Sequence, residues 1–199
     1  MSFLMKISRL IDAVNDFIGQ WAKWLILAAV LICAGNAIIR YSFSISSNAW
    51  LELQWYLFAG VFLLGAPYTL RRDEHVRIDV VASHLSERKQ VWIDIFGMLF
   101  FLLPISCIIL WLSIPYFWLS FAGHEMSGNA GGLIRWPAKF LIVAGFFLMV
   151  LQGLSELIKR IAYLRGLLPF SAFRKHAVDP ALEIAAIAQA GSTDRSEKQ

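Results

Sequence analysis

The chain has 199 residues, of which 58% are hydrophobic and only 16% are charged, and its formal net charge is +4. A soluble domain carries about 25% charged residues, whereas here nearly all charges lie outside four apolar stretches. Four membrane spans and their links use most of the length, which excludes a large soluble domain. The basic residues flank the apolar stretches, where they indicate topology and lipid contact rather than nucleic-acid binding.

The N-terminal region combines an amphipathic segment with the first span. Apolar residues recur at helical spacing over residues 1–20, so an amphipathic helix is predicted there, either lying in the membrane interface or leading into the first span. The first span is predicted over residues 21–41. The polar residues before it and the lack of a small-residue cleavage site are not typical of a signal peptide, so we expect this helix to be retained.

The second span is predicted over residues 49–70 and contains an uncharged, apolar run of sixteen residues, Trp55 to Leu70. A basic cluster follows it directly. The segment 76–88 is polar but places valines and a leucine at helical spacing, which predicts a second interfacial amphipathic helix.

The third span, residues 90–121, is longer than a straight crossing needs, and Pro104 and Pro115 offer positions for a kink. A glycine-rich link, residues 122–136, leads to the fourth span over 137–162. Residues 1–170 are thus predicted to form a single membrane domain, and residues 171–199 a partly disordered tail. The fold class is an all-α integral membrane protein with four transmembrane helices.

Lysines and arginines predict the orientation. Fifteen of the 18 lie in the N-terminal flank, the middle link and the C-terminal region, and the other three (Arg40, Arg135 and Lys139) lie in or beside the remaining links. The positive-inside rule therefore places both termini and the middle link in the cytoplasm.

Several chemistries lack the residues that they need. The four histidines lie in links or in the tail, so a haem held between the spans is disfavoured. Cys33 and Cys107 each stand alone inside apolar stretches, where they are predicted to be small core residues. The sequence has no phosphate-binding glycine loop and no zinc-protease motif, so an enzyme is disfavoured and no cofactor or metal is expected.

A transport pathway within this chain is also disfavoured. Ionisable residues deep inside spans mark such a pathway, but here they stay near span ends, as Glu52, Asp94 and Glu156 do. The two halves show no clear repeat and no broken helices of the kind that build a substrate site. A membrane subunit that depends on a partner explains these features better.

Small residues in the second span are candidates for a helix–helix interface, because they let backbones approach closely in lipid. They are Ala59, Gly60, Gly65 and Ala66, and the two alanines share a helical face. This surface serves either packing among the chain's own helices or contact with a partner, and both uses can coexist on different faces.

The charged residues near the span ends allow more than one interpretation. Glu52 and Arg40 flank the first link, either as an interfacial salt bridge or as a partner contact, and Glu156 and Arg160 have the spacing of a helical ion pair. Candidate lipid-headgroup contacts are Arg71, Arg72, Arg77, Arg88 and Lys89. His75 and Asp79 form either a local hydrogen-bonded turn or part of a partner surface.

Two blocks of sequence carry a family resemblance. The first is ELQWYLFAGVFLLGA from Glu52, followed by HVRIDV from His75; the second is NAGGLIRWPAK from Asn129, followed by QGLSELIK from Gln152. Together, and over roughly residues 20–165, they resemble the small permease subunit of TRAP transporters (tripartite ATP-independent periplasmic transporters). The resemblance is to the subgroup labelled mannitol/chloroaromatic-type.

This resemblance implies a three-part system in the bacterial inner membrane. A periplasmic solute-binding protein captures a small organic anion, and a large permease subunit carries it inward, coupled to sodium that binds on that subunit. The small subunit acts as a scaffold for the large one and helps to dock the binding protein. The candidate partner interface is Glu52, Trp55, Ala59, Gly60, Gly65, Ala66, His75, Asp79, Arg135, Trp136 and Lys139.

Other interpretations stay open. Arg135, Lys139 and His124 are explained equally as anchors at the membrane interface. The chain as a whole is alternatively a small transporter or channel that works alone as a homo-oligomer, or an assembly factor of another membrane complex.

Overall fold

The protein folds into long helices that lie side by side. The computed structural model describes residues 2–44, 47–72 and 85–169. Their regular elements are α1 (Ser2–Phe43), α2 (Asn48–Arg72), α4 (Glu87–Gly97), the π-helical turn η1 (Met98–Leu102), α5 (Leu103–Ala122) and α6 (Trp136–Leu164).

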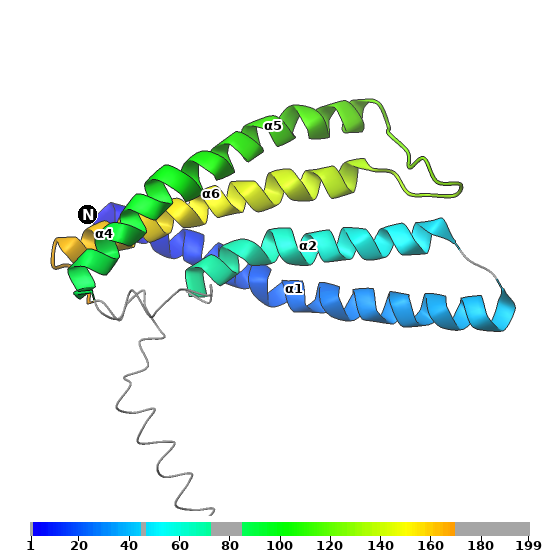
Figure 1. The fold of residues 1–199 in the computed structure, drawn as a ribbon, viewed down its shortest axis with the longest axis horizontal. Helices are drawn as coiled ribbons and strands as arrows, with labels where there is room; N and C mark the ends of the chain where they lie inside the picture. Colours follow the sequence, from blue (N-terminus) through cyan, green and yellow to red (C-terminus); the bar gives the residue numbers. More distant parts are fainter. Residues whose placement is uncertain (1, 45–46, 73–84, 170–199) are drawn as a thin grey trace, which may run out of the picture.

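The helices form an open layer rather than a closed bundle. Figure 1 shows α5, α6, α2 and α1 following one another across this layer, and near its N-terminus α1 crosses to contact α6 as well. α2 and α5 flank α6 and do not pack closely on each other. We call the end with Ser44, Ser47 and residues 123–135 the loop end, and the end with the start of α1 and the end of α6 the terminal end (Figure 1).

Four of the continuous helical stretches are long and apolar enough to cross a membrane: Phe3–Phe43, Asn48–Arg72, Glu87–Ala122 and Trp136–Leu164. This confirms the predicted all-α architecture with four candidate membrane spans. The orientation of the chain in the membrane stays a prediction.

The first helix is longer than the predicted span of residues 21–41. Residues 2–20 do not form a separate helix but continue the first span within α1, which has 42 residues. Such a helix is about 63 Å long, about twice the thickness of the hydrocarbon core of a bilayer. Its N-terminal half therefore extends well past one span, and there it packs against α6.

The backbone hydrogen-bond pattern of the third span changes next to Pro104, which is one of the two positions predicted for a kink. The Leu103 N–H donates to the Met98 carbonyl, five residues back, which defines the π turn η1. Proline supplies no N–H to the helical ladder, and π turns accommodate such local irregularities. Pro115, by contrast, lies inside α5 without ending it.

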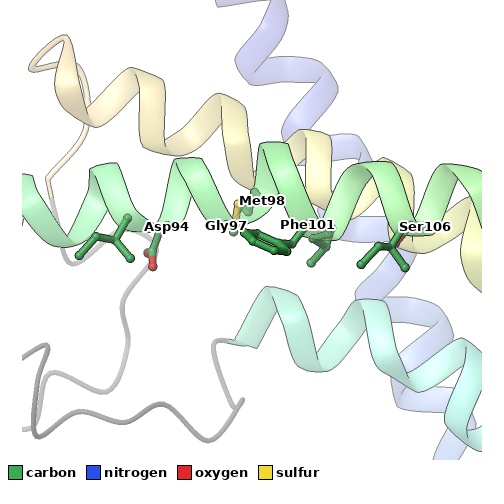
Figure 2. Close-up of a pocket in the computed structure, with 8 residues that line it drawn as sticks. Asp94, Gly97, Met98, Phe101 and Ser106 are labelled. Atoms are coloured by element: carbon green, nitrogen blue, oxygen red, sulfur yellow. The ribbon is translucent and has the colours of Figure 1, made fainter.

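A shallow hollow of about 510 Å³ lies along the surface of this irregular stretch, from Ile93 past Gly97 to Ser106. Figure 2 shows Asp94 at one end of the hollow and Ser106 at the other.

The distribution of side chains is the reverse of that in a soluble protein. Buried residues are mostly polar, among them Ser8, Asn15 and Gln152, whereas many large apolar side chains are exposed. This arrangement suits lipid, which gives apolar groups no reason to leave the surface. Cys33 and Cys107 are both exposed, so the prediction that they are small core residues is wrong. The reason is the same, since lipid does not drive small apolar side chains into the interior.

Some predicted features lie outside the described residues. They are His75, Asp79, Arg77, most of the amphipathic segment 76–88 and the tail 171–199. The roles predicted for these residues therefore stay predictions.

Candidate partner interfaces and the contacts that hold them

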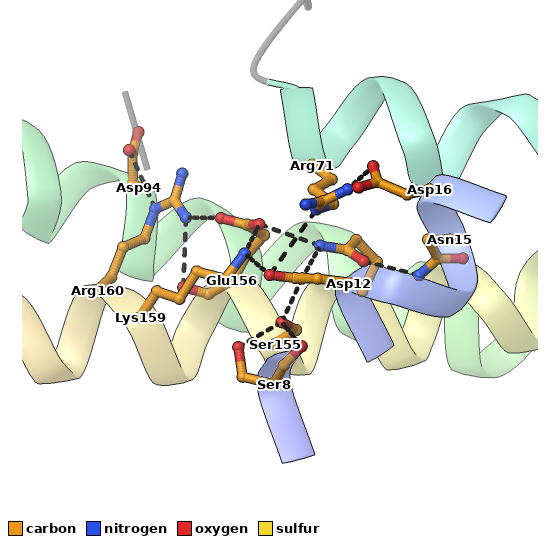
Figure 3. A network of polar contacts seen from close by, with 11 residues as sticks. Ser8, Asp12, Asn15, Asp16, Arg71, Asp94, Ser155, Glu156, Lys159 and Arg160 are labelled. Carbon is orange, nitrogen blue, oxygen red and sulfur yellow. Dashed lines mark hydrogen bonds and ion pairs between the residues drawn. The ribbon is translucent and has the colours of Figure 1, made fainter. Parts of the chain in front are cut away.

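A buried polar network joins α1, α2, α4 and α6 at the terminal end. Figure 3 shows side chains from these four helices converging on Asp12 of α1 and Glu156 of α6. Buried polar groups in a membrane protein are costly unless they are paired. The network therefore fixes which faces of these helices meet.

Four neutral side chains in the network, Ser8, Asn15, Gln152 and Ser155, are almost completely buried. Asn15 Nδ2 donates to Gln152 Oε1 at 2.7 Å, and Gln152 Nε2 donates to Asp12 Oδ1 and Glu156 Oε1, each at 3.0 Å. Ser8 and Ser155 join their hydroxyls at 2.7 Å, and Ser155 Oγ also donates to Asp12 Oδ1 at 2.9 Å. These contacts bind the N-terminal half of α1 to the last turns of α6.

Charged pairs surround this centre. Lys159 Nζ lies 2.7 Å from both Asp12 Oδ2 and Glu156 Oε1. Arg160 Nη1 lies 2.6 Å from Glu156 Oε2, which confirms the predicted helical ion pair, and Arg160 Nε lies 3.2 Å from Asp94 Oδ2 of α4. Arg160 thereby connects the third span to the fourth.

Arg71 belongs to the same network. Its Nε lies 3.8 Å from Asp12 Oδ2, and its guanidinium also pairs with Asp16. Among the other candidate headgroup contacts, Arg72 lies over the Tyr68 ring at 5.1 Å, and Arg88 and Lys89 are exposed at the start of α4. Contact of these residues with headgroups stays a prediction.

At the loop end, Glu52 holds the link between α5 and α6. Its Oε2 accepts the Leu133 N–H at 2.7 Å, and its Oε1 accepts from Asn129 Nδ2 at 2.8 Å and from Ser127 Oγ. The predicted pair between Glu52 and Arg40 is therefore wrong. The carboxylate turns towards a link that is distant in sequence, because that link offers it three donors.

Two neighbours of Glu52 on the same face of α2 extend this clamp. Asn48 Nδ2 donates to the Ala130 carbonyl at 2.9 Å, and the Tyr56 hydroxyl donates to the Ile134 carbonyl at 3.0 Å. Asn48, Glu52 and Tyr56 are four residues apart, so successive helical turns present them to the link. We call these three residues the α2 clamp.

The link itself is ordered by backbone contacts. Met126 and Ile134 form an isolated antiparallel bridge, and the Arg135 N–H donates to the Glu125 carbonyl at 2.8 Å. Gly131 has a φ of +70°, which glycine adopts without strain. A Cβ on Gly132 would lie 2.5 Å from Ser127 Cβ and 2.9 Å from Glu52 Oε1, so the close approach of these two side chains requires glycine there.

Lys139 of α6 closes the other side of the link. Its ammonium pairs with the Glu125 carboxylate and lies over the Tyr116 ring, 3.9 Å from the centroid. The hydrogen bond from Lys139 is the main reason why the pKa of Glu125 lies below its usual value. Trp136 packs edge-on against Phe121 at 5.5 Å, whereas Arg135 and His124 are exposed.

The small residues of α2 divide between two surfaces. A Cβ on Gly60 would meet Leu25 of α1 at 3.2 Å and Leu141 of α6 at 3.8 Å, so Gly60 packs inside the chain. A Cβ on Gly65 would meet nothing within 4 Å. Beside Gly65 in helical spacing are the exposed residues Phe58 and Phe62.

We call Leu51, Phe58, Phe62 and Gly65 the open face of α2. Phe62 is 74% exposed and Phe58 is 43% exposed, so Gly65 forms a notch at the end of a bulky apolar stripe. Trp55, Ala59 and Ala66 lie on the α5 side of this face by helical spacing. The structure thus separates residues that the sequence analysis grouped into one interface.

The polar network and the α2 clamp lie on a chain whose residues 28–162 match the family described as DctQ: Tripartite ATP-independent periplasmic transporters, DctQ component. The match covers more than half of the chain. The chain belongs to the DctQ family. It is therefore the small membrane component of a TRAP transporter, a family of transport subunits rather than enzymes, and its partners are of the large-permease and binding-protein kinds.

The DctQ match includes the whole α2 clamp and the α6 side of the polar network, but it begins after Ser8, Asp12 and Asn15 of α1. Searches among curated proteins and among solved structures found no match.

Apart from the Glu156–Arg160 pair, sequence reasoning missed both groups of contacts. Ser8, Asp12 and Asn15 follow helical spacing, as do Gln152, Ser155 and Lys159. Two polar stripes of this kind in one membrane chain are a signal that they face each other. For the α2 clamp, the spacing of Asn48, Glu52 and Tyr56 is the corresponding signal.

Proposed function

We propose that this DctQ chain is a scaffold that holds the large permease subunit through the open face of α2. The observation that carries the proposal is the space at Gly65, where a Cβ meets nothing, beside the exposed rings of Phe58 and Phe62. In lipid, small residues beside bulky ones favour helix association through close packing. A helix of the large subunit would fill this notch.

The polar network supports a rigid scaffold. It connects α1, α2, α4 and α6 through ion pairs that are largely shielded, for which separation in a medium of low dielectric constant is costly. A large subunit that moves its substrate across the bilayer needs a neighbour that stays in place. The length of α1 and its interfacial charges add to this anchoring.

We propose further that the link 123–135 helps to dock the periplasmic binding protein. The α2 clamp and the Lys139–Glu125 pair hold this link in one shape while Met126 and Asn129 stay exposed. A preorganised surface costs less entropy when a partner binds. If both termini are cytoplasmic, as predicted, this link lies on the periplasmic side of a bacterial inner membrane.

The finer aspects of function rest on the resemblance of the sequence. They are symport with sodium, uptake of small organic anions and membership of the mannitol/chloroaromatic-type subgroup. Sodium and the substrate would bind the large subunit, and this chain would contribute neither site.

Gentle detergent extraction of the tagged chain from its native membrane tests the scaffold proposal. We expect a stoichiometric, polytopic partner, identified by mass spectrometry, and we expect Gly65→Leu to reduce its recovery at least fivefold. Gly35→Leu is the matched control, because a Cβ on Gly35 of α1 also meets nothing within 4 Å.

Equal recovery from the Gly65 and Gly35 variants would remove the open face of α2 from the interface. A chain that is extracted alone and transports a solute in liposomes would support the stand-alone transporter. An unrelated partner would support the assembly factor.

A further inference from the structure

A groove at the loop end runs between α2, α5 and α6. It has a volume of about 460 Å³. Its lining includes Trp55, Ala59 and Leu63 of α2, Tyr116 of α5, Arg135 just before α6, and Ile142 of α6. It exists because α2 and α5 both pack on α6 but not closely on each other. We call it the α2–α5 groove.

The groove has one polar end, which carries the charged groups of Glu52, Lys139 and Arg135. The oxygens of Glu52 are occupied by the link, and Lys139 is paired with Glu125. Arg135 is exposed and, among the described residues, has no carboxylate within ion-pair distance. A guanidinium in this position is suited to a phosphate or carboxylate oxygen pair.

The other end of the groove is apolar. Its lining changes from Glu52 and Arg135 to Ala59, Leu63 and Ile142. Glu52 and Leu63 are eleven positions apart on α2, which is about 16 Å along a helix. That length matches the hydrocarbon depth of one leaflet, about 15 Å, and the exposed Trp55 has the aromatic character of a residue at the headgroup boundary.

We propose that the α2–α5 groove binds one glycerophospholipid, with its phosphodiester at Arg135 and an acyl chain between α2 and α5. This inference does not depend on the scaffold role. A free anion would leave the apolar length of the groove unused.

The phosphodiester and the chain are the recognised parts. The lining of the groove offers Arg135 for the phosphodiester and apolar side chains for the acyl chain, and the proposal assigns no residue to the headgroup alcohol beyond the phosphate. Phosphatidylethanolamine and phosphatidylglycerol should therefore bind with similar affinity. Diacylglycerol lacks the phosphate and inorganic phosphate lacks the chain, and each should bind at least tenfold more weakly.

Native mass spectrometry of the full-length chain, with any subunit that co-purifies, tests the site. The preparation is delipidated and then titrated with each of these four probes. We expect one phospholipid per chain to be retained, and we expect Arg135→Gln and Ala59→Leu each to reduce its retention at least fivefold. One variant removes the charge and the other fills the groove.

Two variants outside the groove are controls. Arg40→Gln removes another exposed arginine at the loop end, and Gly35→Leu adds the same bulk to open space on α1. Both should keep the lipid. Retention in Arg135→Gln and Ala59→Leu equal to that of the controls would overturn the proposal, as would equal binding of diacylglycerol or of inorganic phosphate.

A cross-linker placed at Ala138, which also lines the groove, distinguishes the remaining occupant. Cross-linking to lipid is expected. Efficient cross-linking to the large subunit would show that protein fills the groove and would overturn the proposal as well.

Discussion

Asn15 and Gln152 are 137 positions apart in sequence, yet Asn15 Nδ2 donates to Gln152 Oε1 at 2.7 Å with both side chains almost completely buried. Gln152 also donates to Asp12 and Glu156. One amide thus connects the N-terminal half of α1 to α6 and holds two carboxylates in place. This contact holds the N-terminal half of α1 against α6.

Replacing Gln152 by leucine should destabilise the chain by about 2–4 kcal/mol, because it leaves Asn15 Nδ2 without its buried acceptor and removes one donor from each of Asp12 and Glu156. Thermal unfolding in detergent measures the loss. Gln54→Leu is the control, since Gln54 is also buried in a span but lies outside the network. Equal losses in the two variants would mean that the network adds no stability of its own.

The sequence predicts the four spans because each carries an apolar stretch of membrane length, and it predicts the Glu156–Arg160 pair because the spacing lies within one helix. It does not predict the contacts between helices. Asp12 and Asn15 are typical of an interfacial helix when read alone, and only the packing of α1 on α6 makes them core residues. Glu52 is similar, because its three donors lie 75 or more positions away.

The division of the small residues also depends on packing. Gly60 and Gly65 are both glycines of one apolar helix, and nothing in their immediate sequence assigns one to α1 and α6 and leaves the other open. Cys33 and Cys107 were predicted to be buried on the rule for soluble proteins, which lipid reverses. The polar stripes, not the apolar ones, mark the interior of this chain.

Gly145→Leu should destabilise the isolated chain, whereas Gly65→Leu should not. A Cβ on Gly145 would lie 2.7 Å from the Leu63 carbonyl oxygen, so α2 and α6 must move apart, at a cost of about 1–3 kcal/mol. Unfolding temperatures of the two variants in detergent, without any partner, give the comparison. An unchanged unfolding temperature of the Gly145→Leu variant would show that α2 and α6 separate at little cost.

Glu52→Gln should loosen the link 123–135 while leaving substrate affinity unchanged. The amide presents one NH₂ group to donors that need an acceptor, so at least one of the three contacts is lost, at a cost of about 1–3 kcal/mol. Hydrogen exchange by mass spectrometry should show faster exchange at the Leu133 amide, which donates to Glu52. We also expect weaker assembly or lower stability.

Glu87→Gln is the control for this experiment, because Glu87 accepts a hydrogen bond from Tyr163 in another part of the chain. In the Glu87→Gln variant, the amides of the link 123–135 should exchange at the same rate as in the chain without substitutions. A Glu52→Gln variant that changes only the choice of substrate would contradict the scaffold role.

The pair of Glu125 and Lys139 should make the link sensitive to acid. Because the Lys139 hydrogen bond lowers the pKa of Glu125 below 4.5 in the folded chain, the ionised carboxylate stabilises the fold at neutral pH. That contribution is complete above the pKa of the unfolded chain and is lost as the pH falls through the lower, folded pKa. Glu125→Gln should therefore unfold at a lower temperature than the chain with Glu125 at pH 7. The difference should begin to shrink as the pH falls below about 4.5 and should disappear below the folded pKa. Because Glu125 is partly exposed, with 38% of its side chain accessible, the difference should be small and should shrink in high salt. A difference that does not shrink at all as the pH is lowered from 7 through the usual pKa range of glutamate would mean that Glu125 acts through its shape and not through its charge.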